Sequence, residues 1–170
     1  MKTPKQYILA HLKTLFCLAR KRGAMDLTFD LLYNLIIRKN KNPYYLNRAS
    51  IIVNPVNLHI AQDSLTTIIS LSVSPGIYIQ CNNKVFLGKN VLIAPYVKII
   101  SSNHSKAPSR AWIQDLPIVI EDDVWIGTSA IILPRVTVSK GITIGAGTVV
   151  PKSLNKQYQT YVGNPAREIL

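Results

Sequence analysis

Three histidines are the side chains of this sequence best suited to acid–base chemistry: His11, His59 and His104. A neutral imidazole can take a proton from an attacking group near neutral pH, because the ordinary histidine pKa is about 6.5. Three histidines converging on one ion would instead bind zinc, but here they are scattered along the chain. The two cysteines, Cys17 and Cys81, form no CxxC pair. We therefore expect proton transfer and no metal site.

The composition indicates a folded, strongly basic chain. Its 170 residues are 48% hydrophobic and 16% charged, which suits one buried core with a small extension. A formal charge of +12 favours an anionic partner, whether nucleic acid, anionic lipid or a phosphate-rich cofactor. No segment reaches the roughly 18 unbroken apolar residues of a membrane span, and the N-terminus lacks a small-residue cleavage signal. A cytoplasmic location is the expectation.

The first 50 residues have helical character. Apolar residues recur at helical spacing from Leu9 to Arg38, with an interruption at Gly23. The pattern predicts two short amphipathic helices in an extension over residues 1–50. Their polar faces carry Lys13, Arg20, Lys21, Arg22, Arg38 and Lys39. These faces suit a solvated helical cap, and they also suit peripheral contact with a membrane or another anionic partner.

A period of six replaces the helical spacing after residue 50. Six consecutive blocks read IVIEDD, VWIGTS, AIILPR, VTVSKG, ITIGAG and TVVPKS, and the third residue of each is Ile or Val. Alternation places the first and third residues of a block on one face of a short strand, and small residues after them permit tight corners. We predict that each block is one wall of a β-solenoid covering residues 51–170.

The six-residue repeat is also present upstream, in VFLGKN, VLIAPY and VKIISS, and it is interrupted after these three blocks. Val97 and Ile118 are 21 positions apart, which is not a multiple of six. We therefore predict a loop at about 103–117 that leaves the solenoid, with His104 beside it. Such loops commonly carry function. The stretch from Ser64 to Ile77 is irregular and supports no prediction.

With the blocks aligned, residues 75–169 resemble the hexapeptide-repeat acyltransferases, in particular the sugar and polysaccharide O-acetyltransferases. The resemblance is carried in order by VLIAPYVKIISSNH, PIVIEDDVWIGTSAIILPRVTV, GITIGAGTVVPKS and VGNPAREI. It implies a mainly β fold, a left-handed parallel β-helix preceded by short α-helices, and a homotrimer with active sites between subunits. The handedness comes from the resemblance, since most parallel crossovers are right-handed.

The same resemblance implies acetyl transfer from acetyl-CoA with His104 as general base. Such a base takes the proton of the acceptor as its oxygen attacks the thioester. A backbone N–H must stabilise the resulting oxyanion, and Gly127 and Thr128 are the nearest candidates.

Three residues match the acceptor side of the family's site. Asn82 stands where relatives often have a carboxylate, Trp112 could stack on a sugar, and Asp115 could orient the imidazole. Turn formation or loop packing suits each of them equally well.

The acetyl-CoA side of the resemblance involves more residues. Positions that would line the pantetheine arm are Trp125, Gly127, Thr128, Gly145 and Ala146. Lys152 and Arg167 match basic positions near the adenosine phosphates, and Pro165 would form part of the adenine slot. A solvated surface role is the plain alternative for either cation.

Several functions compete on this fold. We expect O-acetylation of a saccharide hydroxyl in a cell-surface polysaccharide or its precursor. The alternative acceptor is the amine of a nucleotide-linked amino sugar, with base and donor unchanged. Zinc carbonic anhydrases share the fold but need three converging histidines. A basic structural or binding solenoid, including a nucleic-acid binder, would leave His104 and the Trp125 block unexplained.

Overall fold

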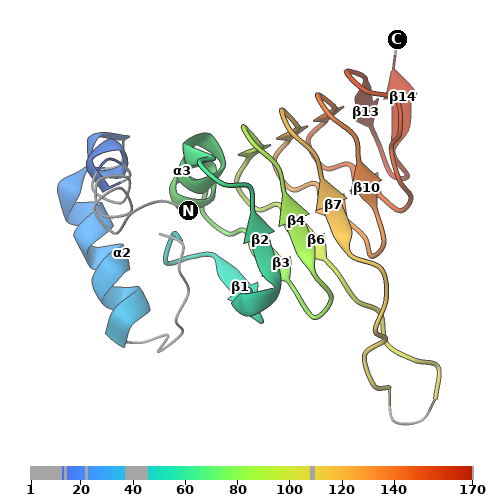
Figure 1. Cartoon of the computed structure of the whole chain (residues 1–170), viewed down its shortest axis with the longest axis horizontal. Coiled ribbons are helices and arrows are strands. Elements are labelled where there is room, and N and C mark those ends of the chain that lie inside the picture. The colour runs from blue at the N-terminus through green and yellow to red at the C-terminus, as the bar shows by residue number, and fades with distance from the viewer. Residues whose placement is uncertain (1–12, 14, 22, 37–45, 108–109, 170) are drawn as a thin grey trace.

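The computed structural model of the chain describes residues 13, 15–21, 23–36, 46–107 and 110–169. A helical layer lies at one end, a three-sided prism of mostly parallel strands follows, and the C-terminus lies at the far end (Figure 1). Within these residues every helix is too short or too polar to cross a bilayer. The prism is the predicted solenoid.

Three sheets form the walls of the prism. Wall A contains β1 (Ile51–Val53), β3 (Tyr78–Gln80), β6 (Lys98–Ile100), β9 (Ile131–Ile132) and β12 (Val149–Val150). Wall B contains β2 (Leu58–Ile60), β4 (Val85–Leu87), β7 (Ile118–Ile120) and β10 (Thr137–Val138). Wall C contains β5 (Leu92–Ile93), β8 (Trp125–Ile126), β11 (Thr143–Ile144), β13 (Thr160–Val162) and the antiparallel β14 (Arg167–Ile169).

Alternation within each block sends side chains either into the core of the prism or out to solvent. In the block VWIGTS, Val124 and Ile126 are fully buried, whereas Trp125 between them is 52% exposed. Ile142 and Ile144 repeat the buried pair one coil later. Each fully buried aliphatic side chain contributes about 1.5–3 kcal/mol. The predicted inward-facing first and third positions are thus confirmed.

Strand pairing gives the size of the insertion that interrupts the six-residue repeat. Strands one regular coil apart are separated by 18 residues, as where Ile131 pairs with Val149. Lys98 pairs with Ile131, 33 residues later, which is 15 more than a regular coil. The predicted loop at 103–117 spans the same number of residues.

A helix lies within the stretch from Ser64 to Ile77, where the irregular repeat supported no prediction. This helix, α3 (Leu65–Val73), takes the place of a strand beside β5 at the start of wall C. Ser70 Oγ accepts the Ile93 N–H at 2.6 Å and donates to the Ile93 carbonyl at 3.0 Å, and Thr67 Oγ1 accepts the Val91 N–H at 3.0 Å. Helix hydroxyls therefore replace the backbone partners that a strand would supply.

Two helical segments precede the prism, as predicted. Residues 13 and 15–21 are helical, and α2 runs Ala24–Ile36. Gly23 separates them with a φ of +85°, a conformation that glycine adopts at little steric cost. Of the predicted basic residues, Lys13, Arg20 and Lys21 are exposed, while Arg22, Arg38 and Lys39 lie outside the described residues.

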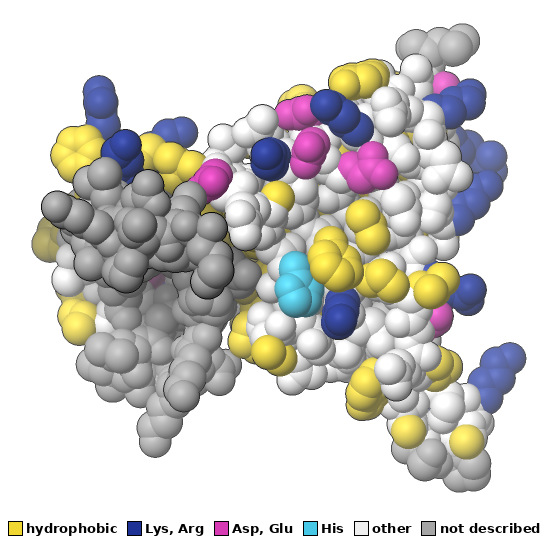
Figure 2. All heavy atoms as spheres, viewed as in Figure 1, with side chains coloured by type: hydrophobic (Ala, Val, Ile, Leu, Met, Phe, Trp, Pro, Cys, Tyr) yellow, Lys and Arg dark blue, Asp and Glu magenta, His cyan; other side chains and the backbone are white. Residues whose placement is uncertain are grey.

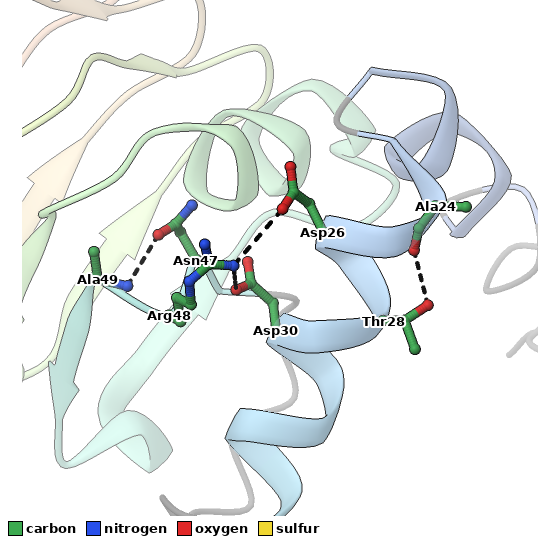
Figure 3. Close-up of polar contacts among 7 residues, drawn as sticks. All are labelled: Ala24, Asp26, Thr28, Asp30, Asn47, Arg48 and Ala49. Atoms are coloured by element: carbon green, nitrogen blue, oxygen red, sulfur yellow. Dashed lines mark hydrogen bonds and ion pairs between the residues drawn. The ribbon is translucent and has the colours of Figure 1, made fainter.

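Arg48, three residues before β1, ties α2 to the prism (Figure 3). Its Nη1 lies 3.2 Å from Oδ1 of Asp30 and 3.9 Å from Oδ1 of Asp26. Asp30 is buried, so this ion pair is better shielded from water than an exposed one. The acidic side of α2 is thereby held toward Arg48.

Candidate functional site

The insertion projects from the turn between walls A and B (Figure 1). Residues 103–107 and 110–113 form the two arms of what we call the hairpin, in which His104 and Trp112 make an antiparallel bridge. The Ser105 N–H donates to the Ala111 carbonyl, and the Ile113 N–H donates to the Asn103 carbonyl, both at 2.8 Å. This pairing holds the exposed His104 side chain outside the prism.

The imidazole of His104 is oriented by the hairpin itself. Its Nδ1 lies 2.5 Å from the carbonyl oxygen of Arg110. Because a carbonyl can only accept, Nδ1 must carry the hydrogen and donate it. In the neutral ring the lone pair then belongs to Nε2, which is the atom able to take a proton from an incoming group.

Asn83 fastens both sides of the hairpin to the prism, and its side chain is only 5% exposed. Its Nδ2 donates to the carbonyls of Ser101 (2.8 Å) and Ile113 (3.1 Å), and its Oδ1 accepts the Asp115 N–H at 3.0 Å. The sequence analysis missed this residue. The Asn82–Asn83 pair was the available signal, but only the first member was considered.

Asp115 does not orient the imidazole within the chain. Its Oδ1 lies 3.3 Å from Nε of Arg135 and also accepts the Leu116 N–H at 2.8 Å. The Arg110 carbonyl, rather than Asp115, contacts the imidazole at Nδ1. Trp112 is half-exposed on the hairpin, so part of its indole remains open to a ligand.

Asn82 lies in a network of neutral polar groups at the base of the hairpin. Its Oδ1 accepts from Nδ2 of Asn54 at 2.6 Å, and its Nδ2 donates to Oγ of Ser102 at 3.1 Å. Oγ of Ser102 in turn donates to Oε1 of Gln80 at 3.0 Å. The Asn82 side chain is therefore uncharged and hydrogen-bonded to its neighbours.

Four of the five predicted pantetheine residues gather at another edge, in the turns from wall C to wall A at 94–97, 127–130 and 145–148; the fifth, Trp125, lies in β8. We call these turns, together with the neighbouring turn 163–166 between β13 and β14, the glycine corner. The Gly127 N–H donates to the Ile144 carbonyl at 2.7 Å, so it is not available to an oxyanion. Among the described residues, the N–H groups of Thr128 and Ala146 have no hydrogen-bond acceptor. Thr128 therefore remains the candidate donor, and Ala146 joins it.

Close stacking of coils explains the glycines of this corner. A Cβ on Gly127 would lie 2.7 Å from the backbone nitrogen of Ala146. A Cβ on Gly145 would lie 2.7 Å from Cγ1 of Val162. Both distances are shorter than van der Waals contact, so a Cβ would force a backbone shift at residue 127 and a movement of the Val162 side chain at residue 145. A role in binding a cofactor is additional to that packing role.

The remaining predicted cofactor residues lie around the last coil. Pro165 is exposed in the turn after β13, and Arg167 is exposed in β14. The Ala166 N–H donates to the Val149 carbonyl at 2.8 Å, which places this turn beside the start of β12. Lys152, also exposed, follows the end of that strand. Arg167 thus lies near the start of β12, whereas Lys152 lies just past its end.

The described residues contain no cluster of three metal-ligating side chains. An open groove of about 530 Å³ lies along wall B, bordered by His59, Phe86, Asp122 and Lys140. Figure 2 shows this face, where hydrophobic side chains run beside a histidine. The imidazole of His59 stacks on the Phe86 ring at a centroid distance of 4.9 Å. None of the predicted site residues borders this groove.

Within one chain the base and the cofactor positions lie on different edges of the prism. The hairpin with His104 leaves between walls A and B, whereas Thr128 and Ala146 lie between walls C and A. Wall A separates the two edges. A single chain therefore does not bring these groups together.

No protein-family model matches the chain. A Schizosaccharomyces pombe protein named as an acetyltransferase is 40% identical over 88 residues, which cover 50% of this chain and 42% of that protein. A galactoside O-acetyltransferase of Lactococcus lactis is 33% identical over 88 residues, covering 46% and 42%. A solved galactoside acetyltransferase in complex with coenzyme A gives a TM-score of 0.59 at 28% identity, covering 71% of this chain and 58% of that one. The chain spans about two fifths of the length of the two sequence relatives.

Proposed function

We propose that this chain is an acetyl-CoA-dependent O-acetyltransferase of the hexapeptide-repeat type, a proposal supported by its parallel β-helix, its repeat sequence and its similarity to galactoside O-acetyltransferases. His104 is the general base and a saccharide hydroxyl is the acceptor. The observation that carries the proposal is the contact between Nδ1 of His104 and the Arg110 carbonyl, which leaves Nε2 to accept a proton.

The residues of the hairpin suit both proton transfers of the reaction. Nε2 of His104 takes the hydroxyl proton while the acceptor oxygen attacks the thioester carbonyl. The carbon–sulfur bond then breaks, the acetyl group stays on the acceptor oxygen, and Nε2 returns the proton to the departing thiolate. The positive ring is stabilised throughout by the Arg110 carbonyl at Nδ1.

The oxyanion needs a donor that the β-ladder has not already used. Gly127 is excluded because its N–H pairs with Ile144. The Thr128 and Ala146 N–H groups are open, so one can face the oxyanion and the other an amide carbonyl of the pantetheine arm. Lys152 and Arg167 would attract the phosphates of the donor.

A second copy of the chain would complete the site, because His104 and the glycine corner lie on different edges of one prism. We propose a closed threefold assembly in which the hairpin of one copy reaches the glycine corner of its neighbour. Such an arrangement places the base of one chain beside the open N–H groups of another.

The neutral surroundings of Asn82 favour a hydroxyl acceptor over an amine. An amine is mostly protonated at neutral pH and is best held by a carboxylate. Here Asn54, Asn82 and Gln80 are uncharged, and the carboxylate of Asp115 is paired with Arg135. The alternative, acylation of a nucleotide-linked amino sugar, has the same base and donor but lacks this support.

The deciding experiment measures thiol release from acetyl-CoA with three acceptor classes: simple sugars and oligosaccharides, polysaccharide precursors, and nucleotide-linked amino sugars. We expect release with a hydroxyl acceptor and an acetyl ester in the product. Acetylation of the amino sugars alone would reject the O-acetyl proposal. No release with any acceptor, together with no binding of acetyl-CoA, would favour a binding solenoid.

A further inference from the structure

The helix α2 exposes an apolar stripe on the side opposite its buried face. Met25 is 75% exposed, Phe29 59% and Leu32 46%, at spacings of four and three residues that place them on one side of the helix. Leu27 and Asp30 lie on the other side and are buried. The helix is thus anchored on one face and presents large apolar side chains to solvent on the other.

The helical residues before α2 repeat this arrangement and add positive charge. Leu18 is fully buried, while Phe16 on the opposite side is 72% exposed. Lys13 and Arg20, three and four residues from Phe16, share its exposed side. Figure 2 shows hydrophobic and basic side chains gathered over this helical end of the molecule.

The acidic side chains of α2 lie away from its exposed apolar stripe. The two acidic residues of α2, Asp26 and Asp30, both face Arg48 at the junction with the prism (Figure 3). The exposed side of the helical end therefore combines apolar side chains with cations. We call this surface the helical patch and define it by Phe16, Met25, Phe29 and Leu32 with Lys13 and Arg20.

We propose that the helical patch docks on the surface of an anionic lipid bilayer. Phenylalanine, methionine and leucine can enter the boundary between headgroups and acyl chains, while lysine and arginine remain at the level of the phosphates. Each cation near such a surface adds to the attraction. A nucleic acid would use the cations but not the apolar stripe, and a second copy of the chain would bring cations against cations.

Vesicle flotation with the full-length chain tests the proposal. Vesicles of phosphatidylcholine alone are compared with vesicles that also contain phosphatidylglycerol. We expect binding to the anionic vesicles only, weakening by roughly tenfold or more in Met25→Ser/Phe29→Ser, which loses apolar contact. Lys13→Gln/Arg20→Gln should weaken binding roughly 30-fold and make it less sensitive to salt.

Matched variants on the prism separate the patch from general charge and hydrophobicity. Val56→Ser removes an equally exposed apolar side chain, and Lys84→Gln/Lys89→Gln removes two exposed cations. Both should bind vesicles as the natural chain does. Circular dichroism and thermal melting verify that every variant folds.

Two outcomes would overturn the proposal. One is vesicle binding that is absent in the natural chain or survives in Met25→Ser/Phe29→Ser. The other is a change in assembly mass by light scattering, without loss of vesicle binding, in that variant, which would identify the patch as a contact between copies. The experiment needs no acyl acceptor, so its result is independent of the proposed reaction.

Discussion

The carbonyl oxygen of Arg110 lies 2.5 Å from Nδ1 of His104, across the neck of the hairpin. The contact joins two residues six positions apart, so the loop that presents the imidazole also sets its tautomer. The orientation of this ring therefore depends on backbone geometry rather than on a carboxylate.

Replacing His104 should abolish most turnover while leaving the donor bound. For His104→Ala we expect kcat to fall about 100-fold or more, because no other group takes the proton from the acceptor. The KM for acetyl-CoA should change little. His59→Ala is the control, since His59 lies on wall B, and it should retain normal turnover. Equal rates in the natural chain and His104→Ala would remove His104 from its role.

Asn83→Asp tests the attachment of the hairpin. The carboxylate can still accept the Asp115 N–H but can no longer donate to the Ser101 and Ile113 carbonyls. We expect a loss of about 1–3 kcal/mol in the free energy of unfolding and a larger proportional loss in kcat than in acetyl-CoA affinity. Asn47→Asp serves as the control, because Oδ1 of Asn47 accepts the Ala49 N–H, which a carboxylate can also do, and Asn47 precedes β1 rather than the hairpin. An unchanged kcat in Asn83→Asp would contradict this interpretation.

A mixed assembly tests whether the site is shared between copies. His104→Ala lacks the base, and Ala146→Trp blocks the glycine corner with a bulky side chain on an exposed residue. Each variant alone should be inactive, whereas random mixing should restore up to about a quarter of normal activity. Mixing His104→Ala with His104→Ala/Ala146→Trp is the control and should restore nothing. Absence of rescue in verified mixed assemblies would show that the site lies within one chain.

Gly127→Ala should destabilise the prism more than Gly145→Ala. The added Cβ on residue 127 meets backbone atoms of Ala146 and Ile144 at 2.7 and 2.8 Å, and a backbone can yield only by shifting a coil. We expect a loss of about 1–3 kcal/mol, measured from denaturant midpoints. At residue 145 the nearest atom belongs to the Val162 side chain, which can rotate away. A smaller loss for Gly127→Ala than for Gly145→Ala would be inconsistent with these contacts.

Burial raises the pKa of the Cys81 thiol from 9.0 to about 12. The folded chain therefore holds this proton more tightly than the unfolded chain. The resulting stability is complete below about pH 9 and is lost as the pH rises toward 12. Urea unfolding at a series of alkaline pH values should show a steeper decline for the natural chain than for Cys81→Ala. Parallel declines would exclude a contribution from Cys81.

The coil period could be predicted because the core of the prism accepts one kind of side chain at fixed positions. Val124 and Ile126 are buried and Trp125 between them is exposed, so the sequence alternates as the walls do. The insertion was detectable for the same reason. A shift in the six-residue repeat is visible where the blocks on both sides of it are regular. These features depend on local sequence alone.

Other features depend on contacts between distant residues. Asn83 and Asn82 are the same residue type, and only the stacking of coils decides which amide reaches Ile113. Asp115 could have faced His104 or Arg135, and the choice depends on a residue 20 positions later. The helix α3 replaces a strand because its hydroxyls satisfy β5, which no period in its own sequence reveals.

The hairpin leaves wall A and the chain re-enters wall B with every later strand in register. Its backbone pairs internally, and its attachment to the prism passes largely through one buried amide, that of Asn83. Substitutions in the hairpin can therefore accumulate while the coils beneath it keep their register, so this segment can diverge in sequence faster than the buried core.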